Sequence, residues 1–236
     1  MEKRRKLTNP TRLYHLTLAK YALDDLRNRR LKIATFDDLN DPFELKSVNL
    51  CNPEHAQAFD GIEALNFKGF KAEMARRYGV LCFSELKNDV LQWSHYAERH
   101  RGICLGFDVS GSSGKFGRVT YRTTRLPFPE HLDEDFLWKL LSTKSQAWKY
   151  EKEWRVFLTL REGVWNECAG RVLYFADFGS ELVLRSVILG AENKTSATEV
   201  LQATQGYNEP VQISRMRLSC CKFELEEYPL EGNTDQ

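Results

Sequence analysis

The stretch that most constrains the fold is residues 149–160, KYEKEWRVFLTL, in which apolar and polar residues alternate. A period of two is typical of a β-strand with one buried face, and the apolar members here are Trp154, Val156, Leu158 and Leu160. The same alternation, carried backwards, places Glu151, Glu153 and Arg155 on the opposite face, about 6.5–7 Å from one neighbour to the next. We therefore expect a charged cluster where this strand enters the core.

This charged cluster has two interpretations. Charges at the entrance to a core cost free energy unless they are paired or used in chemistry. In the structural interpretation, Arg155 forms a salt bridge at the end of the strand. In the functional one, the carboxylates belong to a site, because perturbed acids gather in active sites. The stretch alone leaves both open.

Composition limits the classes of function. The chain has 236 residues, of which 42% are hydrophobic and 28% are charged, as in an ordinary globular protein. With 34 basic and 33 acidic residues, the net charge of +1 argues against nucleic-acid binding through bulk charge, although a local patch stays open. No apolar run approaches the ~20 residues of a membrane span, and no apolar segment follows the basic start to make a secretory signal.

Cysteine and histidine spacing bears on compartment and metal binding. The six cysteines form no CxxC pair, and Cys82 and Cys104 fall in apolar, strand-like runs typical of reduced buried thiols. His95 and His100 are five residues apart, on different sides of a helix, and no HExxH motif occurs. We therefore expect a cytoplasmic protein without a metal site.

The order of expected elements predicts one mixed α+β domain without repeats or a clean linker. Residues 1–6 are expected to be a disordered basic arm, residues 7–228 the domain, and residues 229–236 a disordered tail. Expected strands cover 12–17, 31–35, 79–84, 102–108, 118–122, 154–160, 171–176, 182–189, 210–214 and 216–228. Expected helices cover 19–26, one or two segments of 52–78, 88–101, 130–148 and 196–205.

Three short segments carry polar or aromatic residues where ligands are often bound. His15 closes the first strand before a helix begins, with Thr17 on the same face; a structural hydrogen bond is its alternative role. The turn NDPFE at 40–44 either caps a helix or holds a loop over a pocket. On the expected helix at 88–101, Trp93 and Tyr96 either form an aromatic wall or pack the helix.

Five segments in this order, RLYHLT, FDDLNDPFE, GVLCFSE, LQWSHYAERHRGICLGFD and WKYEKEWRVF, resemble a bacterial and phage-associated family. The family is catalogued as the twenty-nine-seventy-one domain of unknown function. The resemblance runs from Leu13 to Phe157, most of the chain, with further likeness at residues 187–190.

The layout is also similar to the ADP-ribosyltransferase fold, particularly the toxin enzymes that modify nucleic acids. This resemblance implies a split β-sheet core with surrounding helices. It implies that His15 contacts the adenosine-side ribose of NAD and that Ser84 shapes the pocket. It further implies that Glu153 is the catalytic glutamate, with Glu151 as the competing candidate.

The remaining roles come from the same resemblance. The aromatic residue that stacks on nicotinamide is either Tyr96 or Trp93. Thr17 and Arg155 complete the NAD-binding set, and Arg155 either holds the pyrophosphate or keeps Glu153 ionised by lowering its pKa. Three residues of the 40–44 turn would border the acceptor: Asn40, Asp41 and Glu44.

Transfer of ADP-ribose breaks the bond between ribose C1′ and nicotinamide through an oxocarbenium-like state. Nicotinamide leaves as a neutral molecule, so one rigid carboxylate suffices to bind the ribose 2′-OH and stabilise positive charge. The resemblance therefore implies an NAD-dependent ADP-ribosyltransferase, a toxin or phage-defence effector with an RNA, DNA or protein acceptor and an antitoxin partner. The alternatives are a metal-independent ribonuclease or hydrolase using His95 or His15 with Glu153, and a non-catalytic binding module.

Overall fold

The computed structural model describes residues 11–44, 46–49, 62–110, 116–129, 133–161, 163–167 and 170–230. The expected basic arm at 1–6, the helix start near residue 52 and residues 231–236 of the tail lie outside these ranges. The elements in chain order are β1 (Thr11–Thr17), α1 (Ala19–Asn28), β2 (Arg30–Ile33), η1 (Phe36–Asp38), α3 (Ile62–Arg77), β3 (Tyr78–Ser84), α4 (Val90–Tyr96), β4 (Ile103–Val109), β5 (Phe116–Arg118), β6 (Thr120–Arg122), α5 (Glu134–Leu141), β7 (Thr143–Ser145), η2 (Gln146–Glu151), β8 (Glu153–Thr159), β9 (Val164–Asn166), β10 (Arg171–Asp177), β11 (Leu182–Leu189), α6 (Ala197–Ala203), β12 (Gln212–Leu218) and β13 (Leu225–Pro229).

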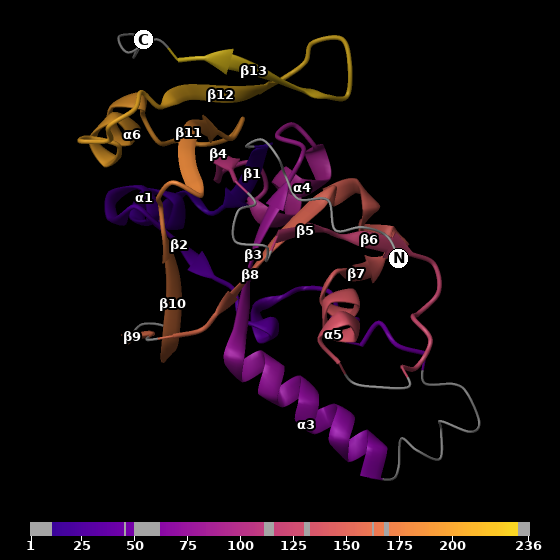
Figure 1. Ribbon diagram of the computed structural model, residues 1–236. Helices are drawn as coiled ribbons and strands as arrows, with labels where there is room; N and C mark the ends of the chain where they lie inside the picture. Colours follow the sequence, from indigo (N-terminus) through magenta and orange to yellow (C-terminus); the bar gives the residue numbers. More distant parts are fainter. Residues whose placement is uncertain are drawn as a thin grey trace.

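An eight-stranded mixed sheet forms the centre of the molecule, in the order β13-β12-β11-β4-β1-β3-β8-β5 (Figure 1). Its neighbours pair antiparallel except β11 and β12, which are parallel. Two smaller sheets, β2-β10-β9 and β6-β7, lie beside it. The expected α+β class is therefore confirmed.

The large sheet divides between β1 and β3. β1 pairs with β4 along all seven of its residues, but its register with β3 is Tyr14 opposite Ser84. At the other end of β3, a bridge joins Val80 to Ala34, which follows β2. The two strands therefore diverge from Ser84 back towards Val80, and a wedge opens between them.

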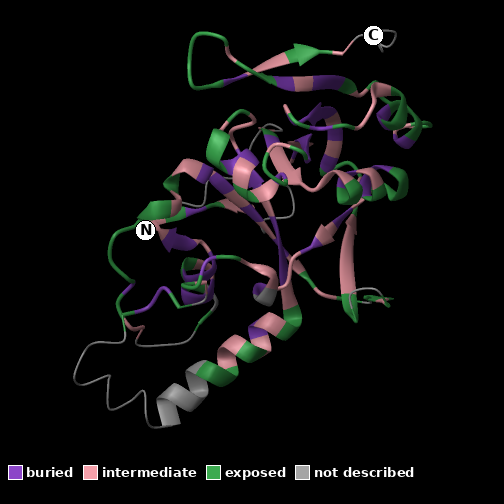
Figure 2. Ribbon diagram, turned by 180° about the vertical axis from the view of Figure 1, so that it is seen from behind, coloured by how far each residue is buried: buried purple, intermediate pink, exposed green. Residues whose placement is uncertain are grey.

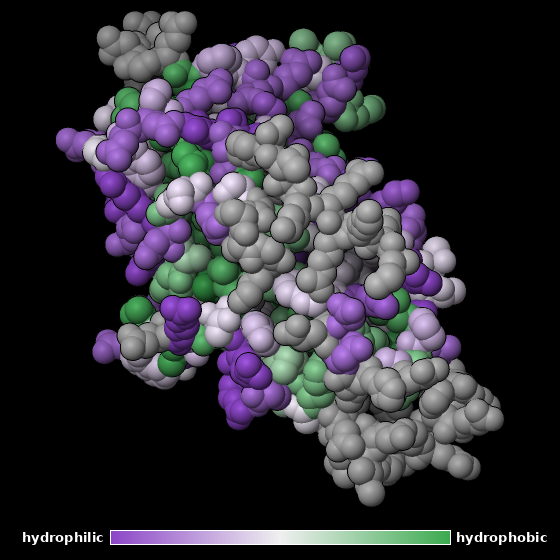
Figure 3. All heavy atoms as spheres, in the orientation of Figure 1, coloured by the Kyte–Doolittle hydropathy of each residue, from purple (hydrophilic) through white to green (hydrophobic). Residues whose placement is uncertain are grey.

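Two large hydrophobic clusters of described residues hold most of the sheet and helices together, and a third, around Trp93 and Met216, packs α4 against the sheet. One packs α1 and α6 against the strands around β4 and β11 and includes Leu26 and Phe107, both 0% exposed. The other packs α5 and the end of α3 against β3 and β8 and includes Leu140 and Phe157. Buried residues gather in the central strands, whereas α3 projects away from them, and its residues 68–77 are mostly half-buried or exposed (Figure 2). In the space-filling view, hydrophilic residues predominate at the edges of the described surface (Figure 3).

The helix expected over 88–101 is wrong in its second half. α4 ends at Tyr96, and Glu98, Arg99 and His100 take left-handed backbone conformations with φ of 49°, 55° and 68°. The left-handed conformation costs about 1–2 kcal/mol for each residue other than glycine. The turn is fixed by backbone hydrogen bonds that run back to Trp93 and Ala97, which the apolar spacing of the sequence does not encode.

The helix expected over 130–148 also ends early, at Leu141. Two hydroxyls compete with the backbone at this point: Ser142 Oγ donates to the Trp138 carbonyl and Thr143 Oγ1 to the Lys139 carbonyl, both at 2.6 Å. The chain then forms β7, which pairs in parallel with β6, and the 3₁₀ helix η2.

The last strand runs just past the predicted domain boundary at residue 228. β13 extends to Pro229, and the Leu230 amide donates to the Ile213 carbonyl at 3.0 Å. The structure therefore continues two residues further.

Candidate functional site

A cavity of about 340 Å³ lies in the wedge between β1 and β3. Its walls come from β1, β2, the 38–44 segment, β3, α4, β7, η2 and β8. Its volume is within the range of small-molecule sites, about 300–1,000 Å³. Eight of the eleven predicted site residues, from segments far apart in the sequence, line this one cavity: His15, Asn40, Glu44, Ser84, Tyr96, Glu151, Glu153 and Arg155.

His15 presents a neutral imidazole to the cavity. Its Nδ1 lies 2.9 Å from the Cys82 carbonyl oxygen, and since a carbonyl only accepts, Nδ1 carries the proton. Burial lowers the pKa of His15, because the charged form loses its hydration. Nε2 is therefore left with a lone pair that can accept a hydrogen bond from a hydroxyl.

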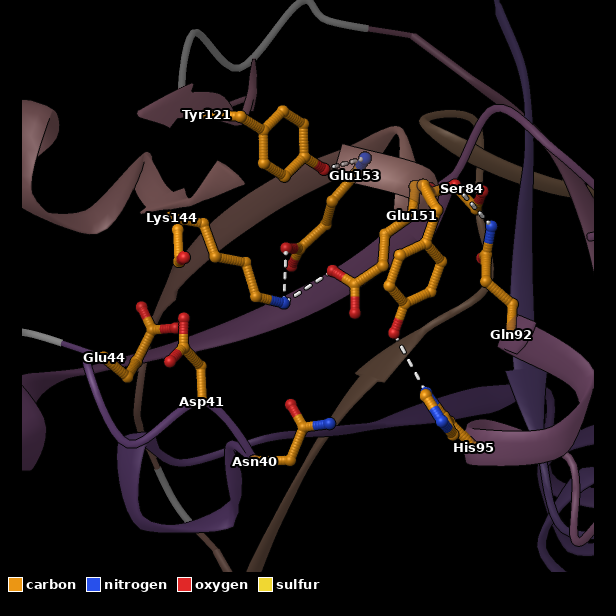
Figure 4. Close-up of polar contacts among 12 residues, drawn as sticks. Asn40, Asp41, Glu44, Ser84, Gln92, His95, Tyr121, Lys144, Glu151 and Glu153 are labelled. Carbon is orange, nitrogen blue, oxygen red and sulfur yellow. Dashed lines mark hydrogen bonds and ion pairs between the residues drawn. The ribbon is translucent and has the colours of Figure 1, made fainter. Parts of the chain in front are cut away.

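Glu153 begins β8, and its carboxylate is held by two cations. Arg155 Nε donates to Oε1 at 2.7 Å and Nη2 to Oε2 at 3.2 Å. Lys144 Nζ donates to Oε2 at 3.2 Å (Figure 4). Burial acts to raise the pKa of Glu153, but Arg155 and then Lys144 outweigh it and hold the pKa at about 2. The Cys82 thiol also hydrogen-bonds this carboxylate, so its roughly four acceptor positions are occupied.

Arg155 is saturated in the same way. Its Nη1 and Nη2 donate to Glu44 at 2.6 and 3.0 Å, and Nη1 also donates to the Leu141 carbonyl at 2.8 Å. With the two bonds to Glu153, all five N–H donors of the guanidinium are used. Arg155 therefore has no donor left for a pyrophosphate, and its contacts are those of the structural salt bridge.

Glu151 does not lie on β8, so the expected extension of the strand back to this residue is wrong. It ends η2, and Lys152 between the two glutamates takes a left-handed conformation with φ of 48°. The two carboxylates nevertheless converge, because Lys144 Nζ lies 2.6 Å from Glu151 Oε2 and 3.2 Å from Glu153 Oε2 (Figure 4).

The surroundings of Glu151 leave it partly free. Its Oε1 accepts from the Tyr96 hydroxyl and its Oε2 from Lys144, so each oxygen keeps one acceptor position. Burial raises the pKa of Glu151, with Lys144 acting against this effect. Ser84 Oγ donates to the Glu151 carbonyl at 2.6 Å and so fixes its backbone, while Asn40 Nδ2 donates to the Tyr96 hydroxyl at 2.9 Å.

The cluster carries surplus negative charge. Three carboxylates, Glu44, Glu151 and Glu153, face two cations, Lys144 and Arg155, and all five side chains are at most 6% exposed. Glu44 and Glu153 share Arg155, which leaves Glu151 dependent on Lys144 alone among the cations. The surplus negative charge therefore lies on Glu151, the carboxylate that can still accept hydrogen bonds.

Three predicted site residues lie elsewhere. Trp93 is fully buried, its Nε1 donates to the Lys87 carbonyl at 2.7 Å and its ring stacks on His100, so it packs the helix. Thr17 is not part of the cavity wall. Asp41 is also outside the wall, and its Oδ1 accepts from the Phe43 amide at 2.9 Å, which stabilises the turn.

Sequence reasoning missed Lys144, which joins the two glutamates. Its position was expected to be helical, whereas both glutamates were expected on a strand, and its spacing of nine residues to Glu153 matches neither a helical nor a strand period. The available signal was the run Ser142-Thr143-Lys144-Ser145, whose hydroxyl residues are poor helix formers.

Fold and site together define a mixed α+β domain whose split central sheet encloses a cavity with an ion network. Over residues 92–156 the chain is similar to a family described as "Protein of unknown function (DUF2971)". The predicted family resemblance is thereby confirmed for this segment, which runs from α4 into β8 and contains Tyr96, Lys144 and both glutamates. No curated protein and no solved structure matches the chain.

Two further findings apply to the described ranges. None of their helices is long and apolar enough to cross a membrane. Within the same part of the chain, no group of three or more His, Cys, Asp or Glu side chains is placed to hold a metal ion.

Proposed function

We propose that the protein is an NAD-dependent ADP-ribosyltransferase, acting as a toxin or phage-defence effector on a nucleic-acid or protein acceptor. One observation carries the proposal: the neutral His15 of the first strand and the carboxylate of Glu151 line the same cavity in the split sheet. Both offer acceptor positions to ribose hydroxyls, His15 through Nε2 and Glu151 through each oxygen.

Within this proposal, Glu151 is the carboxylate that contacts the reacting ribose, and Glu153 positions the ion network. Glu151 accepts a hydrogen bond from the 2′-OH and places negative charge where the oxocarbenium-like state becomes positive. Nicotinamide departs neutral, so no residue has to donate a proton to it. Tyr96 holds the carboxylate through Oε1 and is the one aromatic candidate left at the cavity wall of the two weighed from the sequence.

The cavity also contains a cation that could be released to a pyrophosphate. Lys32 Nζ lies 2.9 Å from Asp38 Oδ2, and its side chain is 36% exposed. Asp38 would keep a partner if Lys32 moved, because Arg171 Nη1 lies 2.5 Å from its other oxygen. Lys32 thus takes the phosphate-binding role that the saturated Arg155 cannot.

The proposal is tested by measuring the release of labelled nicotinamide from NAD. The assay needs no knowledge of the acceptor, because water can accept the ADP-ribosyl group. Glu151→Gln keeps the shape and removes the charge, and we expect it to lower the rate about 10²–10³-fold. Tyr96→Phe should lower it less, since Lys144 still holds the carboxylate. Glu85→Gln, a paired glutamate outside the cavity wall, is the matched control and should keep the wild-type rate. Equal release by wild type and Glu151→Gln would refute the assignment.

The ribonuclease alternative retains one observation. His95 also lines the cavity, with its Nδ1 hydrogen-bonded to the Tyr150 hydroxyl at 2.9 Å. Since Glu151 lines the same cavity, His95 could act with it as an acid–base pair. RNA cleavage without NAD, abolished by His95→Gln, would favour this alternative.

The non-catalytic alternative rests on the saturated pair of Glu153 and Arg155, whose contacts are those of a structural ion pair. Thermal unfolding in millimolar NAD distinguishes it. A ligand at 100 times its dissociation constant adds about 2.7 kcal/mol of stability, so an unchanged midpoint would favour a module that does not bind NAD.

A further inference from the structure

A second cavity, of about 320 Å³, lies on the other side of Lys144. It is formed by Phe43 and Ser47, the end of β6 with the residues that follow it, and β7. Lys144 contributes to the walls of both cavities, and its ammonium group points to the two glutamates of the first. A molecule in the second cavity would therefore lie next to the proposed reaction site.

The wall of the second cavity is basic and rich in hydroxyls. Arg122 and Arg125 are exposed at its edge, and Ser and Thr side chains form much of the remainder. Arg122 Nε makes a long hydrogen bond to the Thr124 carbonyl, at 3.4 Å. Among the residues that the structure describes, no carboxylate lines this cavity or forms an ion pair with either arginine. Both guanidinium groups are thus available to an anion from solvent.

An aromatic ring lies beside the arginines. Phe43 is 44% exposed and lines the cavity, and the Arg125 guanidinium is 5.2 Å from the centre of its ring. Proteins bind single-stranded nucleic acids by combining guanidinium groups with exposed aromatic rings. The guanidinium groups bind backbone phosphates, and the rings stack on bases.

We propose that the second cavity binds a single-stranded nucleic acid, with Arg122 and Arg125 on backbone phosphates and Phe43 stacked on a base. An unpaired base is required, because the bases of a duplex are stacked on each other and cannot reach a side chain in a recess. Net charge near zero is consistent with such a local site, since two arginines and one ring supply the contacts. This binding does not depend on the transferase proposal and would exist without it.

The test is fluorescence anisotropy of a 5′-labelled, 12-nucleotide single-stranded RNA with the full chain, without NAD. We expect Arg122→Gln/Arg125→Gln to weaken binding at least tenfold in 50 mM salt. Loss of two phosphate contacts should also reduce the slope of log K against log salt by about 1.4, at ~0.7 per phosphate. Phe43→Leu alone should weaken binding about fivefold or more, the lower end for one stacked base.

The matched control removes two exposed arginines outside both cavities, Arg27→Gln/Arg217→Gln, and should stay within twofold of wild type. Every variant keeps the same basic N-terminal residues, so their contribution cancels. Equal weakening in the control would overturn the proposal, as would tighter binding of a duplex of the same sequence or no binding at 100 μM protein. Glu151→Gln should bind RNA normally while losing nicotinamide release, so failure of either proposal is distinguishable from failure of the other.

Discussion

Replacing Glu153 with glutamine should destabilise the fold strongly, because this carboxylate is an internal counter-ion. Its pKa of about 2, against an ordinary value of 4.5, corresponds to about 3 kcal/mol of stabilisation of the ionised form. Glutamine also turns one oxygen into an N–H donor that faces Arg155 or Lys144, both of which are donors themselves. Breaking a buried ion pair costs about 3–5 kcal/mol, so we expect a loss of about 3 kcal/mol or more.

The assay is urea unfolding followed by tryptophan fluorescence, supported by calorimetry. For a chain of this size, 3 kcal/mol corresponds to a fall of about 6–12 °C in the unfolding midpoint. Two matched variants distinguish the effect of burial on the free energy of unfolding from the effect of removing a charge. Glu85→Gln alters a half-exposed pair with Arg118 and should cost under about 1 kcal/mol. Glu151→Gln should also cost about 1 kcal/mol, because burial already disfavours its ionised form.

The pH dependence gives an independent check on the same residue. A carboxylate with a lowered folded-state pKa contributes stability that is present above pH 4.5 and is lost as the pH falls towards about 2. Wild type should lose this contribution across that window, whereas Glu153→Gln should not. If the variant stays within 1 kcal/mol of wild type and keeps the same acid slope, the carboxylate is not the counter-ion described here.

Two further predictions concern the frame of the site. Because burial lowers the pKa of His15, the unfolded chain binds a proton before the folded chain does as the pH falls below about 6.5. Wild type should therefore lose stability between pH 7.5 and 5.5, and His15→Gln should lose less, as measured by urea midpoints. A Cβ on Gly190 would lie 2.1 Å from the His100 carbonyl oxygen, so Gly190→Ala should cost about 2–3 kcal/mol, while Gly117→Ala, with no atom within 4 Å, should stay within about 0.5 kcal/mol.

Much of the fold followed from periodicity, and the reason is visible in β8. Trp154, Val156 and Leu158 pack against one hydrophobic cluster, as their alternation predicted. The opposite face, with Glu153 and Arg155, was predicted to hold charge at the entrance to the core. In the structure it is even more buried than the apolar face, because α5, Glu44 and Val48 cover it.

The candidate site was less predictable, because its decisive contacts join segments of unrelated period. Glu44 reaches Arg155 across 111 residues, and no local pattern encodes that pairing. Lys144 was hidden by an expected helix that two hydroxyls end early. His15 and Ser84 were found because each lies at or near the end of a strand beside the split, and the pairing of Tyr14 with Ser84 brings the two strands together there.

The two glutamates have different cationic partners, which leads to a last prediction, about Lys144. Glu153 keeps Arg155 when Lys144 is removed, but Glu151 loses its one cationic partner among the described residues. In Lys144→Met the pKa of Glu151 should therefore rise further above its ordinary value. A raised pKa gives stability that is present below pH 4.5 and lost as the pH rises through the folded-state value.

Lys144→Met should accordingly unfold more easily at pH 8 than at pH 5, opposite to the trend that His15 gives wild type. Adding Glu151→Gln to the variant removes the group that titrates, so the double variant should lose this excess slope. Urea midpoints at four pH values between 5 and 8 measure both slopes. An excess slope that survives in the double variant would place the titrating group elsewhere, and Glu151 would then not be the carboxylate whose charge the site leaves exposed to a ligand.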